Sequence, residues 1–595
     1  MQFVDFSSAH GMLKSTVDSY PDRTAYSWFV EPGVTESVNW REFYDQVIEV
    51  AKSLIALGIK KDDKVNIISY SCYRWALSDL GITTAGGCTV GIYQSNLPKD
   101  CQYIIDHCDA VAIFAEDQVQ LDKLFEIKSE IPDVKKVILL NGDHDDDWVL
   151  SYEDFIKLGK SLPDEEVESR VADTKSTDTA AIVYTSGTTG VPKGSVLTHD
   201  NITFTAQSVK LSGEFQDGDK TFLFLPLAHI FAKSVMYSSI IAAVPLTFAR
   251  KIETVVEDIA VAKPNWFASV PRIYEKIYSK ILGGAESKGG LALKIFRWAV
   301  NVGEKVSDIK LSKKPVPLPL KIKYAVATKL VFSKVQNALG GNVRWCISGA
   351  APLNPSIAKF FHAAGILILE GIGMTENTSF TNINRYDNYR FGWVGQTGPG
   401  IEQKIADDGE VMFRGRNVMK EYYKNPEATE RTFAEDGWLY TGDIGEIDDE
   451  GFLKITDRKK HIIITAGGKN IAPSVIEGVM TTSKYIGQVC IIGDRRKYLS
   501  ALVTLEKENI EDYAKKNNIQ YNDYDELNVN PEIVDLITKE VQSRNKEFAS
   551  FETIKKISIV PEWTIENSCM TPSMKIKKNV IIEEYDEKIG EMYPE

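Results

Sequence analysis

A stretch dense in hydroxyl, amine and glycine residues is the strongest candidate for chemistry in this 595-residue chain. It follows an apolar run at 180–184, which predicts a β-strand, and reads Thr185-Ser186-Gly187-Thr188-Thr189-Gly190-Val191-Pro192-Lys193-Gly194. The glycines let a backbone approach a ligand closely. Five side chains are donors suited to phosphate oxygens: Thr185, Ser186, Thr188, Thr189 and Lys193. The Walker spacing GxxxxGK(S/T) is not met, because Pro192 stands five residues after Gly187. We therefore predict a phosphate-binding loop of another class.

Three further segments before residue 380 carry groups that could act on a ligand. The run 226–231 contains His229, and a turn of small residues after a predicted strand at 343–347 contains Gly349, Ala350 and Ala351. The run 370–376, after a predicted strand at 366–369, contains Glu370, Gly371, Ile372, Thr375 and Glu376. Glu376 is a candidate ligand for Mg²⁺, a hard cation that prefers oxygen. A dinucleotide GxGxxG motif fails here, because Glu376 stands at the last glycine position and would repel pyrophosphate.

Four polar runs follow in the C-terminal third of the chain. The run 437–443 ends in Asp443, and the run 456–460 contains Arg458 and Lys460. The run 465–473 contains Gly467, Gly468 and Lys469, and the run 570–578 contains Lys575, Lys577 and Lys578. Taken alone, a charge run such as 457–460 is typical of a solvated surface turn.

Together and in this order, these motifs resemble those of the adenylate-forming superfamily of acyl-CoA synthetases, adenylation domains and luciferases, across residues ~20–580. The resemblance implies that residues 185–193 hold phosphates, that His229 borders the carboxylate site, and that residues 349–351 and 370–372 lie beside the nucleotide and acyl group. It implies that Thr375 contacts the α-phosphate, that Glu376 binds magnesium, and that Asp443 and Arg458 contact the ribose. Ile372 stands where the family usually has a tyrosine that stacks on adenine.

The resemblance also implies roles for the last two runs. The C-terminal unit pivots at Lys460, and the strip with Gly467, Gly468 and Lys469 then approaches CoA. Lys575 aligns with the catalytic lysine that bridges carboxylate and phosphate, although Met574 replaces the usual preceding glycine. The choice of Lys575 over Lys577 and Lys578 rests on this alignment.

The run Val270-Pro271-Arg272-Ile273-Tyr274-Glu275-Lys276 and the insertion at 283–320 resemble the long-chain fatty acyl-CoA synthetases. Within that insertion, Gly283-Gly284, Gly289-Gly290 and the proline-rich run 315–319 are predicted to interrupt helical pieces. The implied activity is activation of a long-chain fatty acid by ATP and Mg²⁺, followed by transfer to CoA. Three alternatives stay open: a ligase that loads a carrier protein, a CoA ligase for another acid, and an inactive ATP-binding scaffold. Some family members gate the acyl tunnel with a tryptophan where this chain has Lys233.

The elements that must position these groups form an α/β pattern. Short β-branched runs at 65–68, 111–114 and 137–140 alternate with amphipathic stretches such as 43–57, which favours parallel sheets. Turn signals after residue 401 indicate antiparallel strands. By resemblance, residues 1–457 form two α/β subdomains plus a small β-barrel, and residues 458–595 form a smaller mobile α+β domain.

Composition narrows the class of protein. The net charge of −14 argues against a nucleic-acid partner. The seven cysteines include no CxxC pair, and residues 1–5 do not begin a signal peptide, so we expect a cytoplasmic enzyme. Seven lysines and no acid stand between Ile309 and Val335. They predict either a solvated helical face or a patch that meets anionic lipid. The sequence makes no prediction of the oligomeric state.

Overall fold

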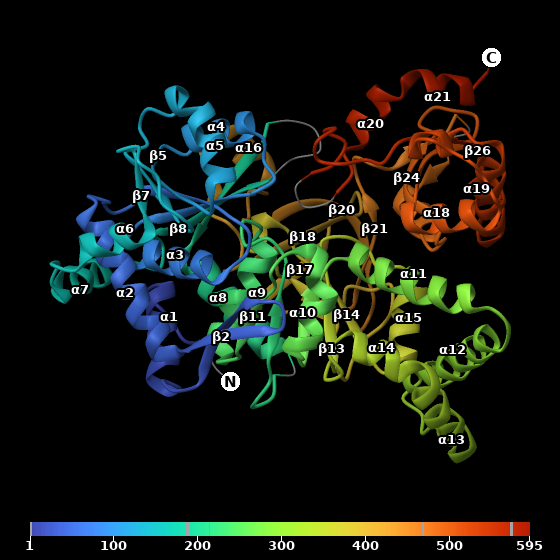
Figure 1. The fold of residues 1–595 in the computed structure, drawn as a ribbon, viewed down its shortest axis with the longest axis horizontal. Helices are drawn as coiled ribbons and strands as arrows, with labels where there is room; N and C mark the ends of the chain where they lie inside the picture. The colour runs from blue at the N-terminus through green and yellow to red at the C-terminus, as the bar shows by residue number, and fades with distance from the viewer. Residues whose placement is uncertain (1–2, 186–190, 214, 467–468, 572–574, 595) are drawn as a thin grey trace.

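The computed structural model describes residues 3–185, 191–213, 215–466, 469–571 and 575–594. Two large sheets and a small antiparallel sheet build the first 458 residues, and a smaller unit follows (Figure 1). The buried apolar clusters divide in the same way, because those of the larger part end at Leu453 and those of the smaller part begin at Ile463. The predicted large α/β part and smaller C-terminal part are therefore confirmed.

The first sheet has eight strands, parallel from β8 to β7 and antiparallel at the other edge. In spatial order they are β19 (Glu421–Tyr422), β9 (Lys193–Thr198), β8 (Thr179–Thr185), β4 (Cys88–Ile92), β3 (Lys64–Ile68), β5 (Ala110–Ala115), β6 (Lys136–Leu139) and β7 (Val149–Ser151). The strands predicted at 65–68, 111–114, 137–140 and 180–184 lie in this sheet.

The second sheet has nine strands and is parallel from β14 to β1. In order they are β16 (Gln396–Thr397), β15 (Asn382–Ile383), β14 (Leu367–Ile372), β13 (Trp345–Ser348), β12 (Trp266–Ser269), β10 (Thr221–Leu223), β11 (Leu246–Phe248), β1 (Thr24–Glu31) and β2 (Val34–Asn39). Ligands of parallel sheets bind outside the carboxyl ends of the strands, and the runs that begin at Pro226, Gly349 and Gly373 all follow such ends.

Helices cover both sheets. They are α1 (Ala9–Ser19), α2 (Trp40–Ala56), α3 (Tyr73–Thr84), α4 (Pro98–His107), α5 (Gln118–Glu126), α6 (Tyr152–Gly159), α7 (Asp164–Asp173), α8 (His199–Ser212), α9 (Ile230–Ala242), α10 (Val255–Ala262), α11 (Pro271–Lys288), α12 (Gly290–Leu311), α13 (Leu318–Ala327), α14 (Ser333–Ala338), α15 (Pro355–Ala363) and α16 (Pro426–Thr432). The predicted helix at 43–57 is α2, which begins at a capping box formed by Asn39 and Glu42.

One local prediction was wrong. Gly283 and Gly284 do not interrupt a helix, because α11 runs through both, and a Cβ at Gly284 would meet nothing within 4 Å. The break falls at Gly289 and Gly290, whose φ angles of 57° and 49° lie in the left-handed region that glycine adopts most easily. The proline-rich run at 315–319 separates α12 from α13, as its ring constraints predict.

The turn signals after residue 401 belong to a four-stranded antiparallel sheet, where the resemblance implied a small barrel. Its order is β17 (Ile401–Ile405), β18 (Glu410–Gly415), β20 (Leu439–Ile447) and β21 (Leu453–Arg458). The C-terminal unit holds the hairpin β22 (Ile463–Ile464) and β23 (Asn470–Ile471), and the sheet β24 (Ile486–Ile492), β25 (Leu499–Leu505) and β26 (Ile554–Ile559). Its helices are α17 (Pro473–Met480), α18 (Lys507–Lys516), α19 (Pro531–Arg544), α20 (Lys578–Glu584) and α21 (Asp586–Met592).

Contacts between the two parts hold the C-terminal unit over α11 (Figure 1). Arg272 donates to the Gly487 carbonyl over 2.7 Å and forms an ion pair with Glu506 at 3.1 Å. Lys484 pairs with Glu286, and Asn354 donates to the carbonyl of Gly478 over 2.9 Å. Among the described helices, none combines the length and apolarity that crossing a bilayer requires.

Candidate active site

The β8–β9 hairpin holds both ends of the predicted phosphate loop. Thr185 pairs with Lys193 across the hairpin, and the Thr185 hydroxyl donates to the Lys193 carbonyl over 3.4 Å. Ser186, Gly187, Thr188, Thr189 and Gly190 lie outside the described residues. The Lys193 ammonium stands 4.2 Å from the centroid of the Tyr422 ring, within cation–π distance.

Tyr422 connects this loop to the magnesium candidate. It lies on β19, which pairs with β9, and its hydroxyl donates to Glu376 Oε1 over 2.5 Å. Burial, and then the charge of Glu376, raises the pKa of Tyr422, so the phenol keeps its proton. Sequence reasoning missed Tyr422, because no recognisable motif surrounds it. It lies 46 residues from Glu376 in the sequence, and only the pairing of β19 with β9 brings the two side chains together.

A tight turn after β14 presents Thr375 and Glu376, both buried. The turn folds back so closely that a Cβ at Gly373 would lie 2.1 Å from the carbonyl carbon and oxygen of Ser379. The backbone carbonyl of Glu376 also accepts a hydrogen bond from the Met419 amide over 2.8 Å. The structure therefore brings Thr375, Glu376 and Lys193 together.

The predicted nucleotide-flanking residues lie at the ends of β13 and β14. Gly349 donates its amide to the Ser269 carbonyl over 3.2 Å, and its missing Cβ would stand 3.2 Å from the Phe231 ring. Ala350 has a φ of 70°, while Ala351 is exposed. Gly371 and Ile372 pair with β15.

Glu370 lies in the same strand, but its carboxylate is engaged by backbone amides. It accepts hydrogen bonds from Gly392 over 2.9 Å and from Leu353 over 3.4 Å. Burial raises the pKa of Glu370 to about 7, and the two hydrogen bonds from backbone amides oppose that rise. These contacts brace the loops at 353 and 392, and this positioning role was not apparent from the sequence.

His229 caps the amino end of α9. Its Nδ1 accepts the Phe231 amide over 3.1 Å, so the neutral ring carries its proton on Nε2. Burial, and then the positive charge of Lys575, lowers the pKa of His229 to about 3. The His229 ring is therefore neutral at physiological pH, and its Nε2–H is the group that could donate a hydrogen bond to a ligand.

Lys233 lies one turn further along α9 and is ion-paired. Its ammonium stands 2.9 Å from Asp79 Oδ1 on α3, with side-chain exposures of 3% and 0%. Tyr237 donates to the other Asp79 oxygen over 3.0 Å. The position that carries a tryptophan gate in other family members here braces α9, which carries His229, against α3.

Asp443 and Arg458 face each other across β20 and β21. Their side chains form an ion pair of 3.0 Å between Arg458 Nε and Asp443 Oδ1. Burial raises the pKa of Asp443, and the charges of Arg458 and Lys575 oppose that rise. The carboxylate is thus a hydrogen-bond acceptor at the boundary between the two parts of the chain.

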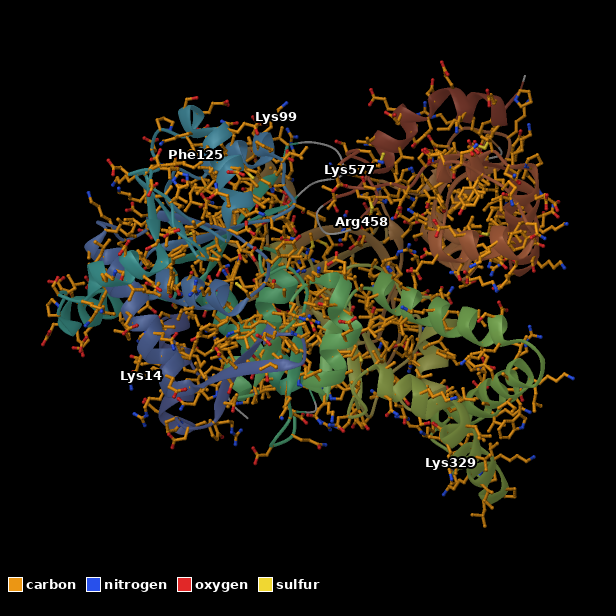
Figure 2. All side chains as sticks on the ribbon, viewed as in Figure 1. Lys14, Lys99, Phe125, Lys329, Arg458 and Lys577 are labelled. Atoms are coloured by element: carbon orange, nitrogen blue, oxygen red, sulfur yellow. The ribbon has the colours of Figure 1, made fainter. Side chains whose placement is uncertain are left out.

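Of the three candidate lysines in the last run, Lys575 reaches this site. Desolvation by the surrounding protein atoms and the charge of Arg458 lower its pKa to about 8, while the charges of Asp443 and Glu376 act in the opposite sense. The side chain keeps access to solvent. Lys578 instead forms an ion pair of 2.8 Å with Glu477 inside the C-terminal unit. Figure 2 places Arg458 and Lys577 on the facing edges of the two parts.

Of the predicted CoA-facing strip, Gly467 and Gly468 lie outside the described residues, and only Lys469 can be placed. Lys469 donates its amide to the Thr465 hydroxyl over 3.2 Å, and its ammonium stands 5.6 Å from the Phe551 ring. Both of these partners belong to the C-terminal unit.

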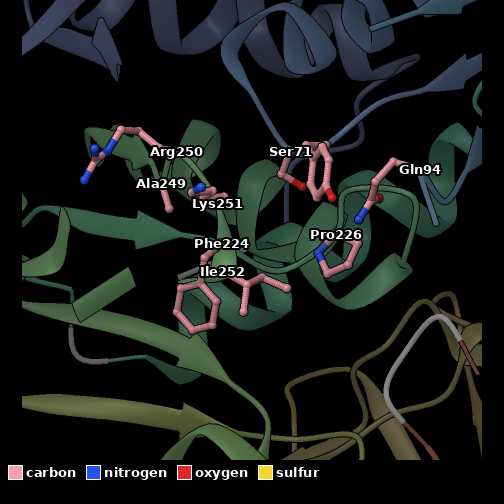
Figure 3. A pocket seen from close by; sticks show the side chains of 9 residues that line it. Ser71, Gln94, Phe224, Pro226, Ala249, Arg250, Lys251 and Ile252 are labelled. Atoms are coloured by element: carbon pink, nitrogen blue, oxygen red, sulfur yellow. The ribbon is translucent and has the colours of Figure 1, made fainter. Parts of the chain in front are cut away.

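A small pocket lies beside the loop that leads to His229 (Figure 3). Its volume of ≈ 20 Å³ is room for about one water molecule. Ser71, on its wall, donates to the Leu225 carbonyl and accepts the Leu227 amide, both over 2.7 Å. The pocket is too small for a nucleotide or an acyl chain, and Ser71 serves to fix the loop.

Comparison with known proteins agrees with the geometry. The chain is 33% identical over 577 residues to the long-chain-fatty-acid–CoA ligase FadD15 of Mycobacterium bovis, covering 96% of this chain and 95% of that one. It is 32% identical to the human long-chain-fatty-acid–CoA ligase ACSBG2, covering 94% and 88%. The peroxisomal long chain acyl-CoA synthetase 7 of Arabidopsis thaliana is 30% identical, with 99% and 87% covered.

Solved structures show the same fold at lower identity. The anthranilate CoA ligase AuaEII with anthranoyl-AMP superposes with a TM-score of 0.73 at 19% identity, covering 98% of both chains. A Mycobacterium tuberculosis fatty acyl CoA synthetase gives 0.62 at 20% identity, covering 98% and 99%. The family model of AMP-binding enzymes matches residues 13–423, and that of their C-terminal domain matches residues 460–595. The chain therefore belongs to the AMP-binding enzyme family.

Proposed function

We propose that the protein is a long-chain fatty acid–CoA ligase that forms acyl-AMP from ATP and then acyl-CoA. One observation carries the proposal: Lys575 of the C-terminal unit interacts electrostatically with Glu376, Asp443 and His229 in the larger part of the chain. A cation with these neighbours is suited to stabilise the negative charges of ATP and a carboxylate. The named relatives, all ligases or synthetases for long-chain acids, support the substrate class.

In the first step, a carboxylate oxygen attacks the α-phosphorus of ATP. The new P–O bond forms as the bond to the β-phosphate oxygen breaks, and pyrophosphate leaves. The chain's own part is to position reactants and stabilise spread charge. We assign this to Lys193, Thr375 and Lys575, with the loop residues Thr185, Ser186, Gly187, Thr188, Thr189 and Gly190. His229 borders the acid, Asp443 and Arg458 hold the ribose, and the backbone at 349–351 and 370–372 flanks the base.

Magnesium fits this site as an ion that arrives with ATP. The described residues hold no cluster of three or more His, Cys, Asp or Glu that could bind a resident metal. Glu376 offers one carboxylate, and Mg²⁺ is usually held by one or two carboxylates plus substrate phosphates. Bound there, the ion would neutralise phosphate charge, while Tyr422 holds the Glu376 side chain in place.

In the second step, the thiol of CoA attacks the acyl carbonyl, a C–S bond forms and AMP leaves. We propose that residues 458–595 turn about Lys460 between the steps, with a boundary at 457/458. Lys575 then departs, and Gly467, Gly468 and Lys469 approach CoA. The contacts of Lys469 within its own unit in the present arrangement support a separate conformation for this step.

The partners in this proposal are small molecules: ATP, CoA and the acid. We also infer that the enzyme works in the cytoplasm, as a peripheral protein that meets a membrane through residues 309–335. We infer no nucleic-acid partner, because a net charge of −14 disfavours binding to a polyanion.

The test is carboxylate-dependent ATP–pyrophosphate exchange with a panel of saturated, unsaturated, aryl and amino acids. Exchange should be greatest with long-chain acids, and adding CoA should convert the product to the thioester. Exchange with another acid class would overturn the substrate assignment. Acyl-AMP that reacts only with a carrier protein would identify a carrier-loading ligase. Binding of ATP without any exchange would identify an inactive scaffold.

A further inference from the structure

Helix α13 lies at a corner of the molecule (Figure 1), and a stripe of apolar side chains along it is exposed to solvent. Leu318, Ile322 and Val326 recur every four residues on it, and Leu330 continues the series into the following π-helical turn. Their exposed fractions are 71%, 59%, 45% and 47%. Four exposed aliphatic side chains in one line form an apolar surface patch of the kind that marks a docking site.

The opposite face of α13 is fixed to the protein. Ala327 and Phe332 are fully buried, and the Tyr324 hydroxyl donates to the Ala363 carbonyl of α15 over 2.9 Å. This anchoring sets the rotation of the helix about its axis. The apolar stripe therefore faces solvent, and it is a surface with no partner among the described residues.

Lysines flank this stripe on both sides. At about 100° per residue, Lys321 falls on one side of the stripe and Lys323 on the other. Lys314, Lys329 and Lys334 are also exposed, and Figure 2 shows Lys329 at the outer edge of this region. Lys310 differs, because it turns toward the Tyr324 ring at 5.8 Å. No acidic residue occurs from Ile309 to Val335, although the whole chain carries −14.

We propose that this face of α13 docks on an anionic lipid surface. The stripe would enter the boundary between headgroups and acyl chains, and the flanking lysines would lie at the level of the lipid phosphates. The acidic remainder of the molecule would be repelled, so the protein would bind in one orientation. The inference deepens the proposed function, because a long-chain acid partitions into the same bilayer.

Vesicle co-sedimentation tests the proposal. The intact protein should bind vesicles made of phosphatidylserine and phosphatidylcholine. It should bind vesicles of pure phosphatidylcholine more weakly, by a factor of about ten or more. The charge-reversed variant Lys321→Glu/Lys323→Glu and the stripe variant Ile322→Ser/Val326→Ser should each lower binding to the anionic vesicles about tenfold or more. All four side chains are exposed, so both variants should keep the thermal unfolding midpoint of the parent protein.

Matched controls make equivalent changes elsewhere. Lys515→Glu/Lys516→Glu alters two exposed lysines near the end of α18, and Val119→Ser/Val529→Ser alters two exposed valines at separate places. Both should bind vesicles as the parent does. Failure of the parent to bind anionic vesicles would overturn the docking surface, as would undiminished binding by the α13 variants. A parent dimer that the stripe variant dissociates would make the stripe a self-association surface instead.

The proposed function is tested separately in the same samples. Exchange activity measured on detergent-dispersed acid needs no vesicle, so the α13 variants should keep it. Loss of vesicle binding with exchange retained supports the docking surface. A parent that binds vesicles but shows no exchange contradicts the proposed function and leaves the docking surface intact.

Discussion

At the scale of single residues, the site depends on charges that compensate one another across long sequence distances. Lys575 lies among Arg458, Asp443 and Glu376, and its positive charge helps to keep His229 neutral. Removing Arg458 or Asp443 should therefore change the pKa of Lys575, because the charges of both groups act on that pKa. Variants at these positions are therefore best examined as a function of pH.

The pKa of Lys575 gives the first prediction. Because desolvation lowers it to about 8, the ammonium loses its proton as the pH rises through that value. If adenylation needs the charged form, kcat/KM for exchange should fall above about pH 8. Lys575→Arg should remove this decrease in kcat/KM at high pH, since an arginine stays protonated. A decrease at the same pH in the arginine variant would contradict the assignment of that decrease to Lys575.

The buried pair of Lys233 and Asp79 supports a second prediction. Lys233→Met leaves an unpaired carboxylate with 0% exposure and should cost about 3–5 kcal/mol of stability, measured as a shift of the urea midpoint. Lys233→Met/Asp79→Asn removes the charge and keeps an acceptor for Tyr237, so it should recover most of that loss. A double variant as unstable as the single one would show that the charge is not the cause.

At the scale of elements, the site is assembled where strands end. The predicted phosphate loop, the small-residue turn and the run with Thr375 and Glu376 follow the ends of β8, β13 and β14. Strand β19, at the edge of the first sheet next to β9, adds Tyr422. Each turn starts from a strand whose direction is fixed by the sheet. A small change in the turn therefore moves all of its candidate binding residues together.

Gly373 provides the prediction at this scale. Gly373→Ala would place a methyl group 2.1 Å from the Ser379 carbonyl, so the turn must shift and carry Thr375 and Glu376 with it. We expect a loss of about 1–3 kcal/mol in stability and a weaker affinity for ATP, measured by calorimetry. Gly478→Ala is the control, because nothing lies within 4 Å there and α17 should tolerate it. Equal ATP affinity in both variants would exclude this role.

At the scale of the whole molecule, the proposed mechanism makes the arrangement of the two parts decide which half-reaction the site performs. Arg272 and Lys484 hold the C-terminal unit near α11, in the arrangement that brings Lys575 to the site. These ion pairs are partly exposed and each is worth at most about 1 kcal/mol. Such contacts stabilise a conformation without preventing exchange with another.

Separate assays of the half-reactions test this division. Lys575→Ala should abolish formation of acyl-AMP, because it removes the cation proposed to bridge carboxylate and phosphate, but it should spare thioester formation from supplied acyl-AMP and CoA. Lys577→Ala, two residues away, is the control and should perform both steps. Rapid-quench assays separate the two rates. An equal loss of both steps in Lys575→Ala would refute a role confined to adenylation.

Much of this protein was predictable from the sequence because the relevant signals are local. Short β-branched runs predicted strands such as β3, β5 and β6, because β-branched side chains fit a pleated sheet that is buried on both faces. The motifs that contain Thr185, Gly349 and Thr375 lie at or just after the ends of β8, β13 and β14, where strands were also predicted, so their backbone context could be anticipated. Gly283 and Gly284 misled because packing on α11 tolerates glycines that isolated propensity disfavours.

What only the tertiary structure decided concerns groups far apart in the chain. Sequence could not place Tyr422 beside Glu376 or Asp79 beneath Lys233, because the packing of distant strands and helices creates these neighbours. Nor could a run of lysines reveal which face of α13 is free, because the rotation of a helix depends on what packs behind it. Local chemistry follows from residue type and spacing, whereas proximity and exposure follow from the packing of the whole chain.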